Sequence, residues 1–181
     1  MATSSPLQDM YRRPGFLLKR CHQVSMAIFL DECREYNITQ SQYGCLRALH
    51  EYPGIDQLTL GRLVGLDRST AGLVIKTLSD RGLIERIINR ADKRRMQLKV
   101  SADGERLLRD IAPAAARAQK RALRGLPRKS RAMFLAMLES FLAGHDALIN
   151  IDEVLSSAVS AIEPKNRPLP RSAQRIRRAN T

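Results

Sequence analysis

The chain has 181 residues, and 44% of them are hydrophobic, which is enough to bury a real core in one compact unit or two small lobes. Aromatic residues make up only 4% and tryptophan is absent, which argues against a platform that stacks single-stranded bases. The formal net charge of +13 favours a polyanionic partner, with nucleic acid first and an anionic membrane second.

The positive charge is concentrated in two stretches. Residues 1–80 carry nine basic and eight acidic residues, whereas residues 81–100 carry seven basic and two acidic residues. Residues 164–181 carry six basic residues and no acidic residue. These two stretches supply most of the surplus, so the sequence favours a localised binding surface over a generally basic exterior.

No stretch approaches the roughly 20 apolar residues of a membrane span, and the polar N-terminus lacks the apolar segment of a signal peptide. We therefore expect a cytoplasmic protein without a membrane partner. Cys21, Cys33 and Cys45 fit neither a paired disulfide framework nor a CxxC metal spacing. We expect them to be small buried hydrophobic residues, and we predict no metal and no cofactor.

Residues 1–13 are expected to form a flexible N-terminus, followed by a long first helix from Pro14 to Tyr36. This segment has no internal breaker, and its apolar residues, including Cys21, keep helical spacing. The sequence "TQSQ" at residues 39–42 matches a capping box, and the proline and glycine at 53 and 54 end the helix that it begins.

The next segment has the pattern of a helix-turn-helix. Asp56 can cap a short helix that ends at Gly65, and Asp67 can cap another that begins at Arg68 and ends near Gly82. Two helices joined by the short turn "GLD" form this motif.

Two strands, "LIERII" and "MQLKV", follow this motif and flank the charged turn "NRADKRR". This pattern predicts a hairpin with an exposed, cationic tip. Ser101 then caps a helix that runs to about Gly125, and a last helix is expected from Pro127 to about Ile149. Residues 160–181 form a basic tail that we expect to be disordered when free.

The helix that begins at Arg68 has two distinct stripes. Its apolar stripe suits anchoring in the lobe, which leaves the opposite stripe free to enter a DNA major groove, where Arg, Ser and Thr can bond to bases or phosphates. A glycine there would permit close approach and a leucine could contact a thymine methyl, although the leucine could instead pack on a neighbouring helix. The predicted groove-facing residues are Arg68, Ser69, Thr70, Gly72, Leu73 and Lys76.

The hairpin tip supplies a second candidate DNA contact. Its cations lie where no core can use them, and a narrow minor groove attracts inserted arginine. Asp92 is placed to hold the guanidinium of Arg94. The predicted contact residues of the tip are Arg90, Asp92, Lys93, Arg94 and Arg95.

The combined spacing resembles the MarR family of bacterial transcription regulators. The matching pieces are "LDRST" opening a helix, "LSDRGLIER" closing it, the Asp-x-Arg at residues 92–94 and "VSADG" before the next helix, over roughly residues 15–150. The resemblance implies a mainly α fold with a small β-hairpin wing, in which residues 38–101 form a winged helix-turn-helix lobe. It also implies an obligate homodimer built from residues 14–37 and 102–150, and repression as the usual mode.

A homodimer with two reading helices requires a pseudo-palindromic double-stranded DNA operator with half-sites about 34 Å apart. The resemblance further implies a small-molecule effector, an aromatic carboxylate or its coenzyme A thioester, bound between the dimer base and the lobe. The candidate ligand residues are Phe16, Arg20, His22, Phe29 and Tyr43. Redox sensing through Cys21 is the alternative, since neighbouring cations can lower the pKa of a thiol.

Two other classes of protein fit the sequence less well. The sequence has no Gly-rich phosphate loop, no HExxH and no GxSxG, and its three histidines are at unrelated positions, so we expect no enzyme. A basic architectural protein that coats DNA without sequence preference remains an alternative. It would bind any duplex similarly, whereas a regulator should prefer one operator.

Overall fold

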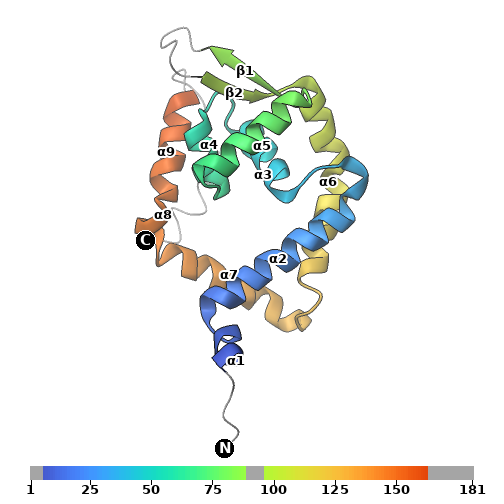
Figure 1. The fold of residues 1–181 in the computed structure, drawn as a ribbon, viewed down its shortest axis with the longest axis vertical. Helices are drawn as coiled ribbons and strands as arrows, with labels where there is room; N and C mark the ends of the chain where they lie inside the picture. Colours follow the sequence, from blue (N-terminus) through green and yellow to red (C-terminus); the bar gives the residue numbers. More distant parts are fainter. Residues whose placement is uncertain (1–5, 89–95, 163–181) are drawn as a thin grey trace, which may run out of the picture.

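The computed structural model describes residues 6–88 and 96–162 of the chain. The described chain is mainly helical, with one two-stranded antiparallel sheet, and this confirms the predicted fold class (Figure 1). The elements in chain order are α1 (Pro6–Tyr11), α2 (Pro14–Glu32), the 3₁₀ helix η1 (Arg34–Tyr36), α3 (Gln40–Glu51), α4 (Gln57–Val64), α5 (Arg68–Asp80), β1 (Ile84–Ile88), β2 (Met96–Val100), α6 (Ala102–Ala122), the 3₁₀ helix η2 (Arg128–Ser130), α7 (Arg131–Ala143), α8 (Asp146–Ile149) and α9 (Ile151–Ile162).

The core lies where α3, α4 and α5 meet, below the hairpin. Aliphatic side chains spaced three or four residues apart on each helix point inward, as amphipathic helices require. The fully buried members include Leu46, Leu49, Leu60, Ile75 and Leu78. This packing fixes the direction of α5 and leaves its opposite side uncovered.

The predicted helix starts are confirmed by their capping contacts. Thr39 and Gln42 form a complete capping box at the start of α3. The carboxylate of Asp56 accepts a hydrogen bond from the Thr59 N–H at 2.8 Å at the start of α4. Gly65 then adopts a left-handed conformation, with φ of +72°, and makes the turn toward α5.

The hairpin pairs Ile84 with Val100 and Ile88 with Met96. A third piece of chain is bound to it, because the Gly54 N–H donates to the Leu98 carbonyl at 2.8 Å and the Leu98 N–H donates to the Ile55 carbonyl at 3.0 Å. The predicted strands are therefore confirmed. The tip, residues 89–95, lies outside the described residues.

The start of α6 packs closely under the hairpin. The Ser101 hydroxyl donates to the Gly82 carbonyl at 2.6 Å and accepts from the Gly104 N–H at 3.1 Å. A Cβ at Gly104 would lie 2.6 Å from Cγ1 of Val100 and even closer to the carbonyl oxygen of Leu83. Only glycine fits at this crossing without a shift of the backbone.

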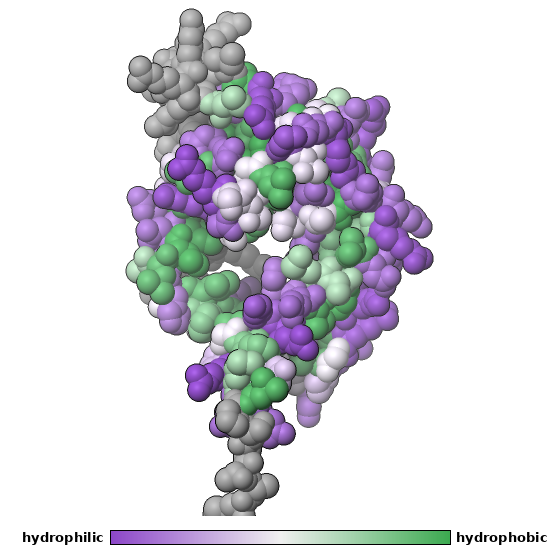
Figure 2. All heavy atoms as spheres, in the orientation of Figure 1, coloured by the Kyte–Doolittle hydropathy of each residue, from purple (hydrophilic) through white to green (hydrophobic). Residues whose placement is uncertain are grey.

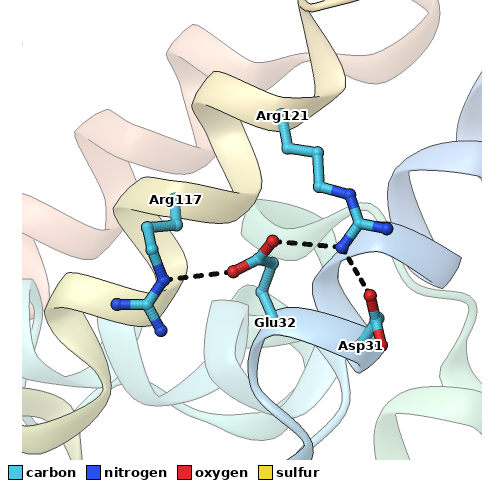
Figure 3. A network of polar contacts seen from close by, with 4 residues as sticks. All are labelled: Asp31, Glu32, Arg117 and Arg121. Atoms are coloured by element: carbon cyan, nitrogen blue, oxygen red, sulfur yellow. Dashed lines mark hydrogen bonds and ion pairs between the residues drawn. The ribbon is translucent and has the colours of Figure 1, made fainter.

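Charged side chains join α2 to α6. Glu32 accepts hydrogen bonds from Arg117 Nε at 3.1 Å and from Arg121 Nη1 at 3.0 Å, and Arg121 also pairs with Asp31 (Figure 3). The hydrogen bonds from these arginines hold the pKa values of both carboxyls below their ordinary values. The two long helices are thereby held together at the C-terminal end of α2.

The prediction of one last helix to about Ile149 is wrong. A 3₁₀ turn precedes α7, which ends at Ala143, and Asn150 has a left-handed conformation with φ of +49° that ends α8 and starts α9. The apolar periodicity continues across these breaks, but Gly144 and Asn150 both suit helix ends. After these breaks, α9 runs back to the lobe and contacts α4, and its Val154 and Ala158 are buried.

Two expectations for the N-terminal half need revision. A short helix, α1, occupies part of the segment expected to be flexible, and Tyr11 stacks edge-on against Phe16 at 4.9 Å between centroids. Cys21 is exposed, contrary to the prediction that all three cysteines are buried, because none of the described residues covers the side of α2 that carries it. Cys33 and Cys45 are buried as predicted.

Apolar side chains are exposed along α2, α7 and α8. Figure 2 shows hydrophobic surface around α8, at the left of the view, and more hydrophilic surface along α6, at the right. The large apolar residues that are exposed on these helices are Leu17, Leu18, Val24, Met26, Leu30, Met133, Leu135, Met137, Phe141, Leu142, Leu148 and Ile149.

Candidate nucleic-acid interface

Helix α5 has one buried side and one exposed side, as its sequence predicts. Ala71, Ile75 and Leu78 are buried in the lobe. On the opposite side, Leu73 is 66% exposed, which excludes packing of this leucine on a neighbouring helix within the described chain. A leucine exposed to this degree on a helix anchored from behind is available to an external surface.

The N-terminus of α5 is held by Asp67. Its carboxylate accepts hydrogen bonds from the Thr70 N–H at 2.9 Å and from the hydroxyls of Ser69 and Thr70, both at 2.7 Å. These bonds hold the pKa of Asp67 well below its ordinary value, and the bond from the Thr70 N–H contributes most. Both hydroxyls therefore use their hydrogens within the protein, and their oxygens remain free to accept a hydrogen bond.

Lys76, farther along the same side, is also engaged within the protein. Its ammonium group lies 2.6 Å from a carboxylate oxygen of Asp80, and both side chains are exposed. Such a pair is weak in water and can open when a stronger anion approaches. Lys76 can therefore meet a phosphate only in competition with Asp80.

Three of the basic residues near the hairpin have structural partners. Arg81 donates to the carbonyls of Asn37 and Tyr36, Arg86 donates to Ser79, and Lys99 pairs with Glu85 at 2.8 Å. The predicted tip residues, Arg90, Asp92, Lys93, Arg94 and Arg95, lie outside the described residues. Of Arg81, Arg86 and Lys99, only Lys99 has its charge paired by a described residue, while Arg81 and Arg86 keep their charge and further N–H donors.

A cavity of about 360 Å³ opens between α4 and α5. Sequence reasoning assigned only one of its polar residues, Arg68, to the interface, and missed Gln57 and Arg62. For Gln57, the only sequence signal was its position directly after Asp56, the cap of α4, because the first turn of α4 faces the start of α5. The cavity is lined by Gln57, Leu58, Gly61, Arg62, Leu66, Arg68 and Ala71.

Gly72 does not line this cavity, but it follows Ala71, which does, and it lies against the side chain of Gln57. A Cβ at Gly72 would lie 3.3 Å from Nε2 of Gln57, which is tighter than ordinary van der Waals contact. The sequence predicts that DNA can approach Gly72 closely, but in the structure the Gln57 side chain already lies close to this glycine.

The candidate ligand residues are brought together only in part. Phe29 and Tyr43 pack with ring centroids 5.4 Å apart, and Phe29 is buried. Arg20 donates to the Gln23 side chain at 3.2 Å, so its partner is a neutral amide rather than an acid. Arg20 and His22 are both exposed on α2. The cavity between α4 and α5 is lined by none of the five candidates.

Other chemistry finds little support in the described chain. Burial raises the pKa of Cys45 to about 12, and it raises that of Cys33 as well, so both thiols are poor nucleophiles at neutral pH. Over residues 6–88 and 96–162, no group of three or more His, Cys, Asp or Glu is placed to hold a metal ion. The same residues include no helix with the length and apolarity of a membrane span.

Comparison with known proteins identifies this architecture. The family model for the MarR family matches residues 38–96, which include the helix-turn-helix, β1 and the start of β2. The solved PcaV transcriptional regulator from Streptomyces coelicolor is 32% identical, has a TM-score of 0.62, and aligns over 75% of this chain and 98% of its own. The chain belongs to the MarR family.

Curated relatives of this MarR-family protein carry consistent names. The transcriptional regulator HosA of Escherichia coli is 26% identical over 106 residues, which are 59% of this chain and 78% of HosA. The transcriptional repressor NicR of Pseudomonas putida is 24% identical over 144 residues, which are 77% of this chain and 91% of NicR. The protein is thus a MarR-type winged-helix transcriptional regulator, and this family is not a class of enzymes.

Proposed function

We propose that this regulator binds a pseudo-palindromic DNA operator as a homodimer, with α5 of each subunit in the major groove, and represses transcription. The observation that carries the proposal is the uncovered side of α5, where Leu73 is 66% exposed on a helix fixed by a buried opposite side. A major groove admits one such helix, and an exposed leucine can contact a thymine methyl. The naming of NicR as a repressor supports the proposed direction of control.

The DNA contacts are assigned to two parts of the lobe. On α5 they are Arg68, Ser69, Thr70, Gly72, Leu73 and Lys76, and on the wing they are Arg90, Asp92, Lys93, Arg94 and Arg95. The oxygens of Ser69 and Thr70, whose hydrogens are held by Asp67, suit the amino groups of adenine or cytosine as donors. The six basic residues after position 164 add phosphate contacts outside the operator.

Exposed apolar surface on α2, α7 and α8 supports the dimer. Monomeric proteins rarely leave a large contiguous apolar patch in water, and a second copy of the same helices is the occupant we propose. Residues 14–37 and 102–150 then form the dimerisation region, and such a dimer has to hold its two lobes at the spacing of half-sites about 34 Å apart.

We assign the effector to a small aromatic carboxylate or its coenzyme A thioester. PcaV has been solved in complex with its natural ligand, which supports ligand control in a protein of this kind. The charge of Arg20, bonded to the neutral Gln23, can meet a carboxylate, and Phe16, His22, Phe29 and Tyr43 complete the proposed site. If the effector binds more tightly to a dimer whose lobes have another spacing, it weakens DNA binding. The loss of DNA affinity cannot exceed the difference between the effector's affinities for the two forms of the dimer.

Redox control through Cys21 is the second candidate, and the exposure of this thiol favours it. In that case peroxide should release the wild-type protein from DNA, and the Cys21→Ser variant should stay bound.

The deciding experiment is a fluorescence anisotropy titration of the full chain with the DNA upstream of its own gene and with a scrambled duplex, repeated with a panel of aromatic acids and their coenzyme A thioesters. We expect a preference of roughly a thousandfold or more for one operator and its loss with one of the compounds. Leu73→Ala should reduce that preference, whereas Arg94→Ala should weaken binding to all operators more evenly. Equal affinity for both duplexes would indicate an architectural protein instead.

A further inference from the structure

The cavity between α4 and α5 has the composition of an anion site. Three of its lining side chains, Gln57, Arg62 and Arg68, carry hydrogen-bond donors, and none of its lining residues is acidic. Within residues 6–88 and 96–162, neither guanidinium forms an ion pair and the Gln57 amide has no hydrogen-bond partner in the protein. In the described part of the chain, these donors are therefore available to a ligand.

The position of the cavity selects the kind of anion. It lies along the first turn of α5, where Arg68 and Ala71 line it, on the same helix as the exposed Leu73. A helix lying in a major groove has its flanks beside the sugar-phosphate backbones that border the groove. The apolar part of the lining, Leu58 and Leu66, can cover a deoxyribose while the donors meet the phosphate.

We propose that this cavity binds one backbone phosphate of each operator half-site, with Gln57, Arg62 and Arg68 as hydrogen-bond donors. Because Gly72 has no side chain, it leaves the space that the Gln57 amide occupies. The proposal rests on the proposed function and deepens it, because it adds Gln57 and Arg62 to the interface and gives Gly72 a role through Gln57 in place of the direct DNA contact assigned to it above. The conformation of α5 does not require this glycine, since Gly72 has no positive φ. Its lack of a side chain instead leaves room for Nε2 of Gln57, 3.3 Å from the place of a Cβ.

The coupling between Gly72 and Gln57 is testable with a double-mutant cycle. Gly72→Ala should weaken operator binding about tenfold, the scale of one lost hydrogen bond to a charged group, and Gln57→Ala should do the same. In the Gln57→Ala background, Gly72→Ala should add no further loss, because no amide remains to be displaced. Equal losses in both backgrounds would overturn the coupling and show that DNA itself approaches Gly72.

Thermal unfolding separates this role from a structural one. Alanine is favoured over glycine inside a helix, so Gly72→Ala should keep or raise the melting temperature while it lowers DNA affinity. A fall in melting temperature that parallels the loss of binding would contradict the proposal. Gln119→Ala, which changes an exposed glutamine on α6, is the matched control and should alter neither quantity.

The phosphate itself can be located with operator duplexes in which one phosphate at a time is replaced by an uncharged methylphosphonate. One position in each half-site should weaken wild-type binding and have no effect on binding by the Arg62→Gln variant. The proposal is overturned if no position shows this loss of sensitivity. Failure of the proposed function looks different, because the unmodified wild type would then bind operator and scrambled duplexes equally.

Discussion

Arg121 of α6 donates a hydrogen bond to Glu32 at the C-terminal end of α2, at 3.0 Å and across 89 residues of sequence. Because this bond and the one from Arg117 lower the pKa of Glu32, its contribution to stability is complete above the ordinary carboxyl pKa and is lost as the pH falls toward the lower, folded-state value. Glu32→Gln should therefore lower the melting temperature modestly at pH 7. The difference from wild type should shrink below about pH 4, as differential scanning calorimetry across pH would show. A constant difference would contradict this account.

The glycine at the start of α6 gives a second prediction. Gly104→Ala should destabilise the protein by about 1 to 3 kcal/mol, because the added methyl group would clash with Leu83 and Val100 and force the backbone to shift. Chemical denaturation would measure the change. Gly125→Ala is the matched control, since a Cβ there meets nothing within 4 Å, and it should be close to neutral.

The pair formed by Lys76 and Asp80 leads to a third prediction. Asp80→Asn should strengthen binding to operator and scrambled duplexes alike, because it frees the Lys76 ammonium and removes an acidic group near DNA. The slope of log affinity against log salt should steepen by about 0.9 for each additional phosphate that the protein neutralises. Asp103→Asn, which breaks an exposed pair with Arg106 at the start of α6, should leave binding unchanged.

The basic residues after α9 give a fourth prediction. Replacing the six basic residues between 164 and 181 with glutamine should flatten the salt dependence of binding, because neutral side chains release no counterions from phosphates. The effect should be larger on an operator with long flanks than on one trimmed to the half-sites. Neutralising the exposed Arg109 and Lys120 of α6 is the control, and an unchanged slope in the tail variant would refute the role of the tail.

The helix starts could be predicted from sequence because they depend on residues within one turn of each other. Thr39, Asp56, Asp67 and Ser101 each have a side-chain acceptor followed three residues later by the N–H that it binds, and no distant contact is needed. The two stripes of α5 were predictable for the same reason, since helical periodicity alone decides which residues share a side.

The last helices and the cavity depend on contacts between distant segments. The apolar period runs on past Gly144, so nothing local showed that α9 would turn back toward α4. Gln57 was missed because its relation to Gly72 exists only after α4 and α5 have packed. Cys21 was misplaced because periodicity shows which side of a helix is apolar but not what covers it.

The return of α9 to α4 sets a practical limit on shortening this protein. Val154 and Ala158 cover one side of the first helix of the DNA-binding motif, so a polypeptide ending before Ile151 would expose that side to water and tend to aggregate. Trimming of the C-terminus for crystallisation should therefore begin after Ile162, even though the segment matched by the family model ends at residue 96.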